Sequence, residues 1–210
     1  MLTKKELEII LSKLKPYGQK PSLEQYTITS SLAAEILHIA RMNGDIVNKK
    51  VADFGCGSGR LAIGAALLDA KSVTAVDIDK ACILAAKENL RIAEQLSGRK
   101  IKSIKFVCSD IKYFNGRFDT VVQNPPFGIQ SLHADRIFLK KAIACANRIY
   151  SLHKNGYEKT VRFLKKFIEN NGCRVLAVQK FKFDLPYTFK FHQKPKYSYS
   201  VALYVIEAAK

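Results

Sequence analysis

The sequence predicts an α/β fold: one domain built on a seven-stranded, mostly parallel sheet, with helices on both faces and an antiparallel strand at the edge. Three observations lead to this prediction. Short apolar runs that suit buried strands alternate with longer segments of helical periodicity. A glycine-rich loop follows the first of these strands and opens a helix. The 210 residues suffice for one full α/β core and contain no linker or repeat.

Residues 1–45 are expected to form a helical extension of this single domain, 1–210. The apolar residues of Leu2–Leu14 recur at helical spacing, which predicts an amphipathic helix. A loop with two prolines and a glycine follows. A second helix is expected to begin there, with Ser30 or Ser31 as its cap, because either hydroxyl can accept from a free backbone NH.

Strands and helices alternate after this extension at the spacing of βαβ units, which favours a parallel, doubly wound sheet. No helix separates the last two strands, so we expect them to pair antiparallel at the edge. The expected helices run from the glycine loop to Leu68, from Asp79 to about Leu96, over about Asp135–Asn147 and over about Tyr157–Glu169. The expected strands are Lys50–Phe54, Ser72–Val76, Ile104–Val107, Phe118–Val122, Arg148–Leu152, Arg174–Phe183 and Ser198–Ile206.

The formal net charge of +17 suggests a polyanionic partner, most simply a nucleic acid. No apolar run approaches the roughly 20 residues that a membrane helix needs, so no membrane contact is expected. The lysine-rich N-terminus lacks the features of a secretory signal, which favours a cytoplasmic protein.

The five cysteines lie far apart in the sequence and include no CxxC pair. This pattern argues against a disulfide framework and against a zinc site, and no metal ligands are predicted. We expect the cysteines to be small buried apolar residues in a reducing compartment.

Acidic residues stand at the ends of the first three predicted strands. Asp53 precedes the glycine loop Gly55–Gly59, Asp77 follows about twenty residues later, and Asp110 ends the third strand. Because the carboxyl ends of parallel strands meet at one edge, these groups are expected to form one site. Asp77 can accept hydrogen bonds from ribose hydroxyls, and Asp110 from an adenine amine, with Ile111 offering its backbone NH to the ring.

The glycine loop has neither the GK[ST] of a phosphate loop nor the GxGxxG spacing of a dinucleotide site. An NAD site would share the acid at Asp77, yet three acids suit a neutral or cationic adenosine ligand better than a pyrophosphate. Asp53 is placed to orient the loop or to bind the ammonium of a methionine moiety. The pattern therefore favours S-adenosylmethionine as the cofactor.

A rigid tetrapeptide, Asn124-Pro125-Pro126-Phe127, follows the fourth predicted strand. The two prolines restrict the backbone, so that the Asn124 side chain and the Pro125 carbonyl offer two fixed acceptors to one NH2 group. Phe127 offers a ring on which a planar base can stack. An aromatic amine is a poor nucleophile because its lone pair is delocalised into the ring. Two acceptors that bind both of its N–H groups would aim the lone pair at an activated methyl group. These four residues are the predicted catalytic residues.

In its glycine loop and its Asn124–Phe127 motif, the chain resembles the Rossmann-like class I methyltransferases that act on amino groups. It is most similar to the small family that forms N6-methyladenosine in small-subunit ribosomal RNA. The likeness covers nearly the whole chain, although the proline that usually follows its first motif is replaced by Thr27-Ile28-Thr29. The motifs that carry it are Leu23-Glu24-Gln25-Tyr26, Asp53 to Gly59, Val76-Asp77-Ile78-Asp79, Asn124-Pro125-Pro126-Phe127-Gly128, Tyr150-Ser151-Leu152-His153-Lys154, Asp184-Leu185-Pro186 and Phe189-Lys190-Phe191-His192.

The resemblance implies that the N-terminal extension closes over the cofactor through Gln25, Tyr26 and the following turn. It implies that Asn124 to Phe127 hold the target adenine. Relatives in the family work with a small zinc-binding activator that covers an exposed sheet edge, so such a partner is expected here. The full set of implied cofactor contacts is Gln25, Tyr26, Ile28, Asp53, Gly55, Gly57, Ser58, Arg60, Asp77, Ile78, Asp110 and Ile111.

The segment 180–199 interleaves lysines with aromatic residues. Cations bind phosphates, and aromatic rings stack on unpaired bases, so part of this segment is predicted to contact RNA. His153 is expected to serve structure or a phosphate contact before any role as a base. The predicted RNA contacts are Lys154, Lys190, His192, Lys194 and Lys196.

The sequence leaves alternatives open. An NPPF-type motif also serves methyl transfer to adenine in DNA, to guanine N2 and to protein glutamine. A scaffold that binds RNA and has lost catalysis is a further alternative, although the intact Asp77, Asp110 and NPPF set argues against it. The predicted function is methylation of adenine N6 in RNA, with small-subunit rRNA as the expected partner.

Overall fold

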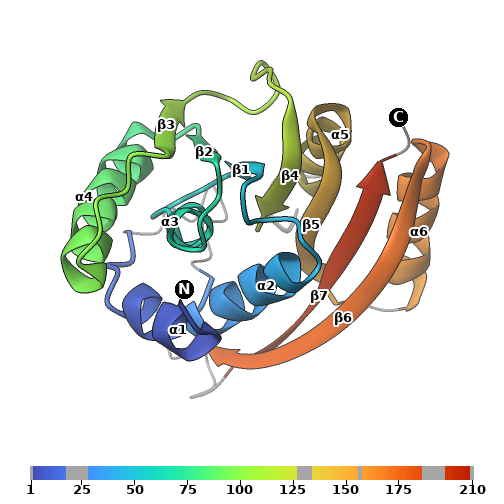
Figure 1. Ribbon diagram of the computed structural model, residues 1–210. Helices are drawn as coiled ribbons and strands as arrows, with labels where there is room; N and C mark the ends of the chain where they lie inside the picture. The colour runs from blue at the N-terminus through green and yellow to red at the C-terminus, as the bar shows by residue number, and fades with distance from the viewer. Residues whose placement is uncertain (1, 18–27, 127–133, 156–157, 186–196, 209–210) are drawn as a thin grey trace.

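The computed structural model describes residues 2–17, 28–126, 134–155, 158–185 and 197–208 (Figure 1). A single sheet lies at its centre, with the strand order β3-β2-β1-β4-β5-β7-β6. The helices are α1 Lys4–Ser12, α2 Ser30–Met42, α3 Arg60–Leu67, α4 Lys80–Ser97, α5 Ala134–Cys145 and α6 Glu158–Asn170. The strands are β1 Lys50–Phe54, β2 Ser72–Asp77, β3 Ile104–Cys108, β4 Phe118–Gln123, β5 Ala146–Lys154, β6 Cys173–Leu185 and β7 Tyr197–Ala208.

Strand directions confirm the predicted α/β fold. The strands β1 to β5 pair in parallel, whereas β7 runs antiparallel to both of its neighbours, β5 and β6. The antiparallel pair therefore lies at the edge as predicted, with β6 outermost and β7 as the reversed strand. The helix α6 carries the chain from β5 past one strand position to β6, and β7 then fills the gap between them.

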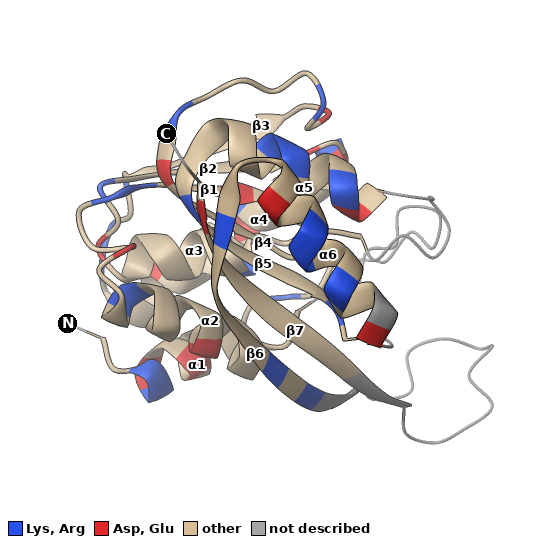
Figure 2. Ribbon diagram, turned by 90° about the vertical axis from the view of Figure 1, so that its right-hand side faces the viewer, with Lys and Arg blue, Asp and Glu red and all other residues tan. Residues whose placement is uncertain are grey.

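Helices cover both faces of the sheet. Figure 2 shows α1, α2 and α3 on one side of the strands and α5 and α6 on the other. Alternate strand residues face the two layers: Val51 and Val73 pack with α1 to α4, and Ala52 and Val121 pack with α5 and α6. This period-2 alternation explains why the central strands are apolar throughout.

Local chemistry sets the helix starts. Thr3 and Glu6 form a reciprocal cap at the start of α1, in which the Thr3 backbone NH donates to Glu6 Oε2 at 2.8 Å. The cap of α2 is Thr29, whose Oγ1 accepts from the Leu32 NH at 3.2 Å, and not Ser30 or Ser31. Thr29 has extended backbone angles, and a capping residue must lie just outside the helical turn that it satisfies.

Two further expectations need correction. The helix α5 ends at Cys145, before the predicted Asn147, because Ala146 already pairs with Phe118 in the sheet. Cys108 is exposed, whereas the other four cysteines are buried as expected. Cys108 ends β3, which is the edge strand and has a neighbour on one side only among the described strands.

Arg60 ties the N-terminal extension to the domain. Its guanidinium donates to the backbone carbonyls of Ile28 at 2.6 Å, Leu14 at 3.1 Å and Leu11 at 3.3 Å. Because Arg60 is the first residue of α3, these bonds fix the end of α1 and the residue before the cap of α2 beside the glycine loop.

Asn89 of α4 makes a second tie at the same place. Its Nδ2 donates to the carbonyls of Lys15 and Ser58 at 2.9 Å each, and its Oδ1 accepts from the Lys15 NH at 2.9 Å. Asn89 is 1% exposed, and its bond to Ser58 lies in the interior. Asn89 therefore joins the N-terminal extension, the glycine loop and α4.

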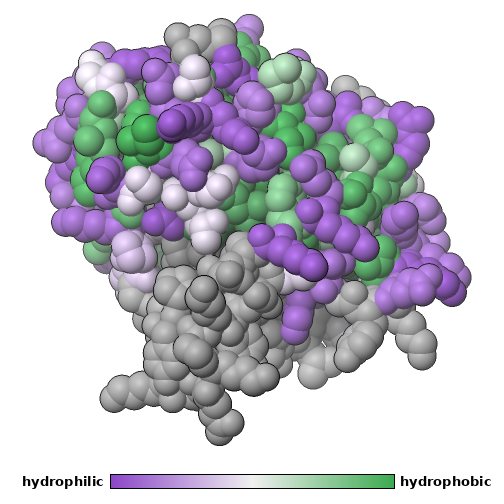
Figure 3. Space-filling model, turned by 90° about the horizontal axis from the view of Figure 1, so that it is seen from below, coloured by the Kyte–Doolittle hydropathy of each residue, from purple (hydrophilic) through white to green (hydrophobic). Residues whose placement is uncertain are grey.

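The strands β4 and β6 point downward in Figure 1, so Figure 3 looks at the edge where they end. Hydrophilic residues predominate over the described part of this face, with hydrophobic patches among them (Figure 3). Within the described ranges, no helix is both long and apolar enough to cross a membrane.

Candidate active site

The residues predicted from the strand ends meet at one edge of the sheet. Phe54, the last residue of β1, pairs with Val76 of β2 on one side and with Gln123 of β4 on the other. Asp77 in turn pairs with Cys108, the last residue of β3. The groups that follow these positions in the chain are thereby brought side by side, as the prediction required.

The glycine loop needs its glycines for conformation and for space. Gly55, Gly57 and Gly59 all have positive φ, at 70°, 51° and 84°. A Cβ on Gly55 would lie 3.0 Å from the Phe138 ring, and one on Gly59 would lie 3.0 Å from Ala86. A Cβ on Gly57 would meet nothing within 4 Å of the described residues. Gly57 thus borders open space at the strand ends.

Asp77 organises this loop. Its Oδ2 accepts from the Gly57 NH at 2.8 Å, and its Oδ1 accepts from the Asp79 NH at 2.9 Å. Burial raises the pKa of Asp77, partly against the effect of these two backbone donors. Each carboxylate oxygen can accept a second hydrogen bond, so the group still has capacity for ligand hydroxyls.

Asp53 is the most deeply buried acid of the site, with 1% of its surface exposed. Its Oδ2 accepts from the Ala62 NH near the start of α3 at 2.9 Å. Its Oδ1 has no hydrogen-bond partner among the described residues. Burial raises the pKa of Asp53 to about 8, and the nearby charge of Asp77 acts in the same direction. Two neighbouring buried acids with spare acceptors suit a positively charged ligand.

The adenine end of the expected cofactor site is shaped by Ile78, Asp110 and Ile111. Ile78 is 56% exposed directly after β2, so its apolar side chain is available to a ligand at this edge. Asp110 Oδ1 accepts from the Lys112 NH at 2.8 Å, and the Asp110 carbonyl accepts from Tyr113 and Phe114. Ile111 is buried at 6%. Asp110 therefore holds the turn after β3, and Ile78 provides the apolar surface beside it.

The predicted catalytic motif begins where β4 ends. Asn124 is half-buried, Pro125 is buried and Pro126 is half-buried, whereas Phe127 lies outside the described residues. Just before them, Gln123 is 1% exposed and its Nε2 donates to Ser151 Oγ on β5 at 2.8 Å. The strand end that carries Asn124 is thus anchored by a buried hydrogen bond to its neighbour.

This bond belongs to a buried polar chain that the sequence analysis missed. Ser151 Oγ lies 2.8 Å from Nε2 of His153, and the His153 ring meets Tyr204 edge-on at 5.4 Å. Burial lowers the pKa of His153 to about 4, so the imidazole is neutral at physiological pH. The sequence did offer a signal. Polar Gln123 directly follows the fourth predicted strand, and polar Ser151 lies inside the fifth.

Phe138 is a second residue that sequence reasoning did not find. It lies on α5 and its ring covers Gly55 of the glycine loop. The helix that follows the predicted catalytic motif therefore packs directly on the glycine loop. An aromatic residue near the start of that helix was a visible but unspecific signal.

The other predicted contacts divide into three groups. Ser58 is buried and its carbonyl accepts from Asn89, while the Arg60 guanidinium is taken up by the N-terminal extension, so the contacts of Arg60 favour a structural role over the expected cofactor contact. Ile28 is 9% exposed, and Lys154 is exposed at the end of β5. The predicted site residues that lie outside the described ranges are Gln25, Tyr26, Phe127, Lys190, His192, Lys194 and Lys196.

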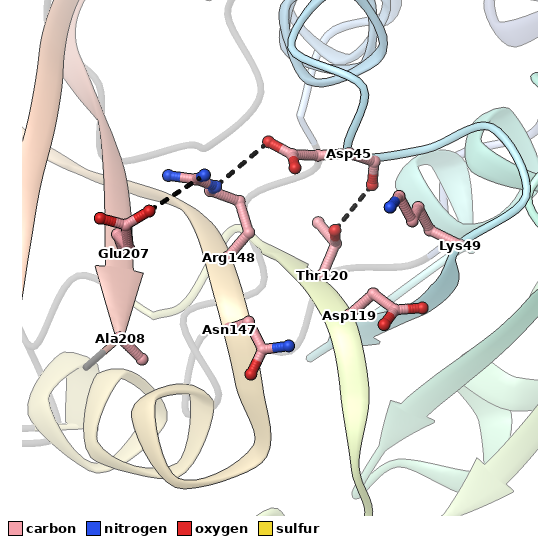
Figure 4. Close-up of a pocket in the computed structure, with 8 residues that line it drawn as sticks. All are labelled: Asp45, Lys49, Asp119, Thr120, Asn147, Arg148, Glu207 and Ala208. Atoms are coloured by element: carbon pink, nitrogen blue, oxygen red, sulfur yellow. Dashed lines mark hydrogen bonds and ion pairs between the residues drawn. The ribbon is translucent and has the colours of Figure 1, made fainter. Parts of the chain in front are cut away.

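A charged pocket of about 300 Å³ lies at the opposite edge of the sheet (Figure 4). Figure 4 shows Arg148 between Asp45 and Glu207, with N–O distances of 3.3 Å to each. Asp45 also accepts from the Tyr150 hydroxyl at 2.6 Å. These charges pair with one another and join the loop after α2 to β5 and β7. The pocket is therefore a structural cluster, away from the carboxyl ends of the parallel strands. No group of three or more metal-ligating residues occurs in the described ranges.

Comparison with known proteins agrees with this geometry. The family model of ribosomal protein L11 methyltransferases (PrmA) matches residues 29–125. A crystal structure of PH1948 from Pyrococcus horikoshii, named as an RNA methyltransferase, superposes with a TM-score of 0.88 at 39% identity and covers 100% of both chains. The uncharacterized protein MJ0284 of Methanocaldococcus jannaschii is 39% identical over 99% of this chain and 95% of its own length.

Fold and site together define a class I, S-adenosylmethionine-dependent methyltransferase. The zebrafish (Danio rerio) rRNA N6-adenosine-methyltransferase METTL5 is 36% identical over 90% of this chain and 91% of its own length. The protein belongs to this METTL5 family of methyltransferases.

Proposed function

We propose that the protein transfers a methyl group from S-adenosylmethionine to N6 of an adenosine in small-subunit rRNA. The observation that carries the proposal is the position of Asn124 and Pro125 at the end of β4, beside the acid-lined loop after β1. Relatives named as rRNA N6-adenosine-methyltransferases support the acceptor, and the net charge of +17 supports RNA.

The chain's own groups have positioning roles under this proposal. The bound cofactor supplies a methyl group already activated on a sulfonium, so transfer depends on alignment and on exclusion of water. The Asn124 side chain and the Pro125 carbonyl accept hydrogen bonds from the two N6–H groups and turn the nitrogen lone pair toward that methyl. Once the new N–C bond has formed, the nitrogen releases one proton to water. Phe127 stacks on the adenine ring, which adds a contact that any planar base can use.

The cofactor roles follow the fit described above. Gly55 and Gly57 line the methionine part, and the spare oxygen of Asp53 accepts from its ammonium. Asp77 binds the ribose hydroxyls, and Ile78, Asp110 and Ile111 bind the adenine. Gln25 and Tyr26 close over the cofactor. Hydrogen bonds at both ends of the segment that carries them support this role. Arg60 binds Leu14 and Ile28, and Asn89 binds Lys15, so both ends are held beside the glycine loop.

A partner protein and an RNA contact complete the proposal. The edge strand β3 has half-buried Ile104, Phe106 and Val107, which suits cover by the small zinc-binding activator that the family resemblance implies. The exposed Lys154, with Lys190, His192, Lys194 and Lys196, would contact RNA phosphates. Five free cysteines suit a reducing cytoplasm as the place of action.

The test uses purified protein, labelled S-adenosylmethionine and small-subunit rRNA, followed by nucleoside analysis of the product. N6-methyladenosine in the wild-type reaction, its loss in Asn124→Ala and unchanged cofactor affinity in that variant are the expected results. Full activity of Asn124→Ala would contradict the mechanism. A product of N2-methylguanosine would overturn the acceptor.

The match to L11 methyltransferases gives a second candidate, methylation of a ribosomal protein. That match covers residues 29–125, which hold the cofactor edge and end just inside the NPPF motif. It therefore bears on the cofactor more than on the acceptor. Label found in protein and not in RNA, when intact subunits are the substrate, would favour this candidate.

A further inference from the structure

Helices α5 and α6 carry an exposed aromatic ring with a cation stacked on it. The guanidinium carbon of Arg136, in the first turn of α5, lies 4.2 Å from the centre of the Phe163 ring on α6. Phe163 is 42% exposed and also stacks on Phe167, one helical turn further on, at 6.4 Å and 27°. A guanidinium held over an exposed ring is a planar cation beside an aromatic surface, and both can stack on further planar groups.

The Arg136 guanidinium has no carboxylate within 4 Å and makes no side-chain hydrogen bond to any residue that the structure describes. By contrast, Arg162 on the same surface is paired with Glu158 at 3.3 Å. Among the described residues, nothing takes up the donors or the charge of Arg136, and the Phe163 ring lies against its guanidinium.

The surrounding helix surfaces are basic. Lys140 lies one turn after Arg136 on α5, and Lys165 and Lys166 are exposed on α6. Figure 2 shows Lys and Arg residues in blue along α5 and α6, on the face of the sheet opposite α1 to α3. Several cations on two neighbouring helices suit an extended polyanion better than a single small ion.

The Arg136–Phe163 pair lies at the active-site end of α5. Phe138, two residues after Arg136, covers Gly55 of the cofactor loop. The first turn of α5 therefore lies near the glycine loop, at the edge of the sheet where β4 ends before Asn124, so that an RNA strand whose target base is held at Asn124 would pass this surface.

We propose that Arg136 and Phe163, with Lys140 and Lys166, form a docking surface for unpaired RNA next to the target nucleotide. A neighbouring base stacks on the Arg136 guanidinium, and phosphates bind the two lysines. Stacking on arginine planes and aromatic rings is the usual way in which proteins hold single-stranded RNA. This inference rests on the proposed RNA substrate and adds the surface that holds it.

Four variants separate the contributions. Arg136→Gln removes both the charge and the plane, Arg136→Lys keeps the charge only, and Phe163→Leu keeps apolar bulk without the ring. Arg91→Gln is the matched control, because Arg91 is an exposed helical arginine of α4 on the other face of the sheet. Thermal unfolding and S-adenosylmethionine affinity are measured for each variant to show that fold and cofactor site are intact.

RNA affinity is measured by fluorescence anisotropy with a single-stranded rRNA fragment and with a duplex of the same sequence, over a range of salt. Arg136→Gln should weaken single-strand binding about tenfold and lower the salt slope by about one, whereas Arg91→Gln should leave both near wild type. Arg136→Lys should keep the salt slope but lose most of the preference for the single strand. Phe163→Leu should lose that preference as well.

Wild-type RNA affinity in Arg136→Gln and Phe163→Leu would overturn the inference. So would a monomer–dimer change in Phe163→Leu without any change in RNA affinity, since the surface would then join two copies of the chain. The two proposals fail separately. RNA binding that depends on Arg136, without N6-methyladenosine, would contradict the proposed function alone. N6 methylation with an unchanged KM for RNA in Arg136→Gln would contradict the docking surface alone.

Discussion

The Gly57 backbone NH donates to Oδ2 of Asp77 at 2.8 Å and so joins the loop after β1 to the end of β2. This bond holds the loop in the positive-φ form that leaves open space at Gly57. One side chain thereby shapes the loop and, in the proposed function, receives the ribose.

Replacing Asp77 by Asn should weaken S-adenosylmethionine binding by about 10- to 100-fold, because hydrogen bonds to a charged acceptor contribute about 1.5–3 kcal/mol. The amide keeps the size but can offer only one oxygen to the NH groups of Gly57 and Asp79. Isothermal titration with S-adenosylmethionine measures the change. Glu88→Gln, a half-exposed acid on α4, is the control, and equal affinities in wild type and Asp77→Asn would contradict this role.

Asp53 makes the stability of the ligand-free protein depend on pH. Its folded pKa of about 8 lies above the unfolded value near 3.8, so its contribution to stability is fully present below about pH 4. It is lost progressively as the pH rises to about 8, since only the unfolded chain ionises freely over that range. The free energy of unfolding of Asp53→Asn should therefore fall less than that of the wild type between pH 4 and pH 8.

Cofactor binding should act on Asp53 in the opposite direction. A bound ammonium favours the ionised carboxylate, so binding near pH 7 should release protons, and Asp53→Asn should abolish most of this release. Titration in buffers of different ionisation enthalpy measures it. Equal proton release in wild type and variant would mean that Asp53 does not face the positive charge.

The chain Gln123–Ser151–His153 allows a comparison between two kinds of loss. Ser151→Ala removes the shared hydroxyl, leaves a buried donor and a buried imidazole nitrogen unpaired, and should cost about 1–3 kcal/mol. Gln123→Met should cost less, because it also removes Gln123 Oε1, which is buried without a partner among the described residues. Urea unfolding of the two variants measures the difference, and a larger loss in Gln123→Met would contradict this account.

Arg60→Ala should free the N-terminal extension from the glycine loop. It removes three hydrogen bonds to the carbonyls of Leu11, Leu14 and Ile28, for a loss of about 1.5–3 kcal/mol. Hydrogen exchange should accelerate at the end of α1 and at the start of α2 before it does so in the sheet. Arg91→Ala removes an exposed arginine of α4 and should change neither measurement. Unchanged exchange in Arg60→Ala would show that the extension is held by its apolar contacts alone.

Much of the fold could be predicted because the signals are local. Periodicity predicted the seven strands to within a few residues. Gly55, Gly57 and Gly59 predicted the loop, since positive φ favours glycine. Acids at strand ends predicted one shared edge, and the sheet brings these strand ends together, because parallel strands place their carboxyl ends side by side. The cap at Thr29 and the early end of α5 differed from the prediction, because adjacent residues compete for such positions and strand pairing can override helix propensity.

The sequence by itself determined which segments are strands, where the chain turns and which polar groups stand at the sheet edge. Only the tertiary structure decided the insertion of β7 between β5 and β6, the contacts of Arg60 and Asn89, and the stacking of Arg136 on Phe163. The physical reason is sequence separation. Hydrophobic periodicity and turn chemistry act over a few neighbouring residues, whereas the contacts of Arg60, Asn89 and Arg136 join residues that lie 27 to 74 positions apart and meet only when the layers pack.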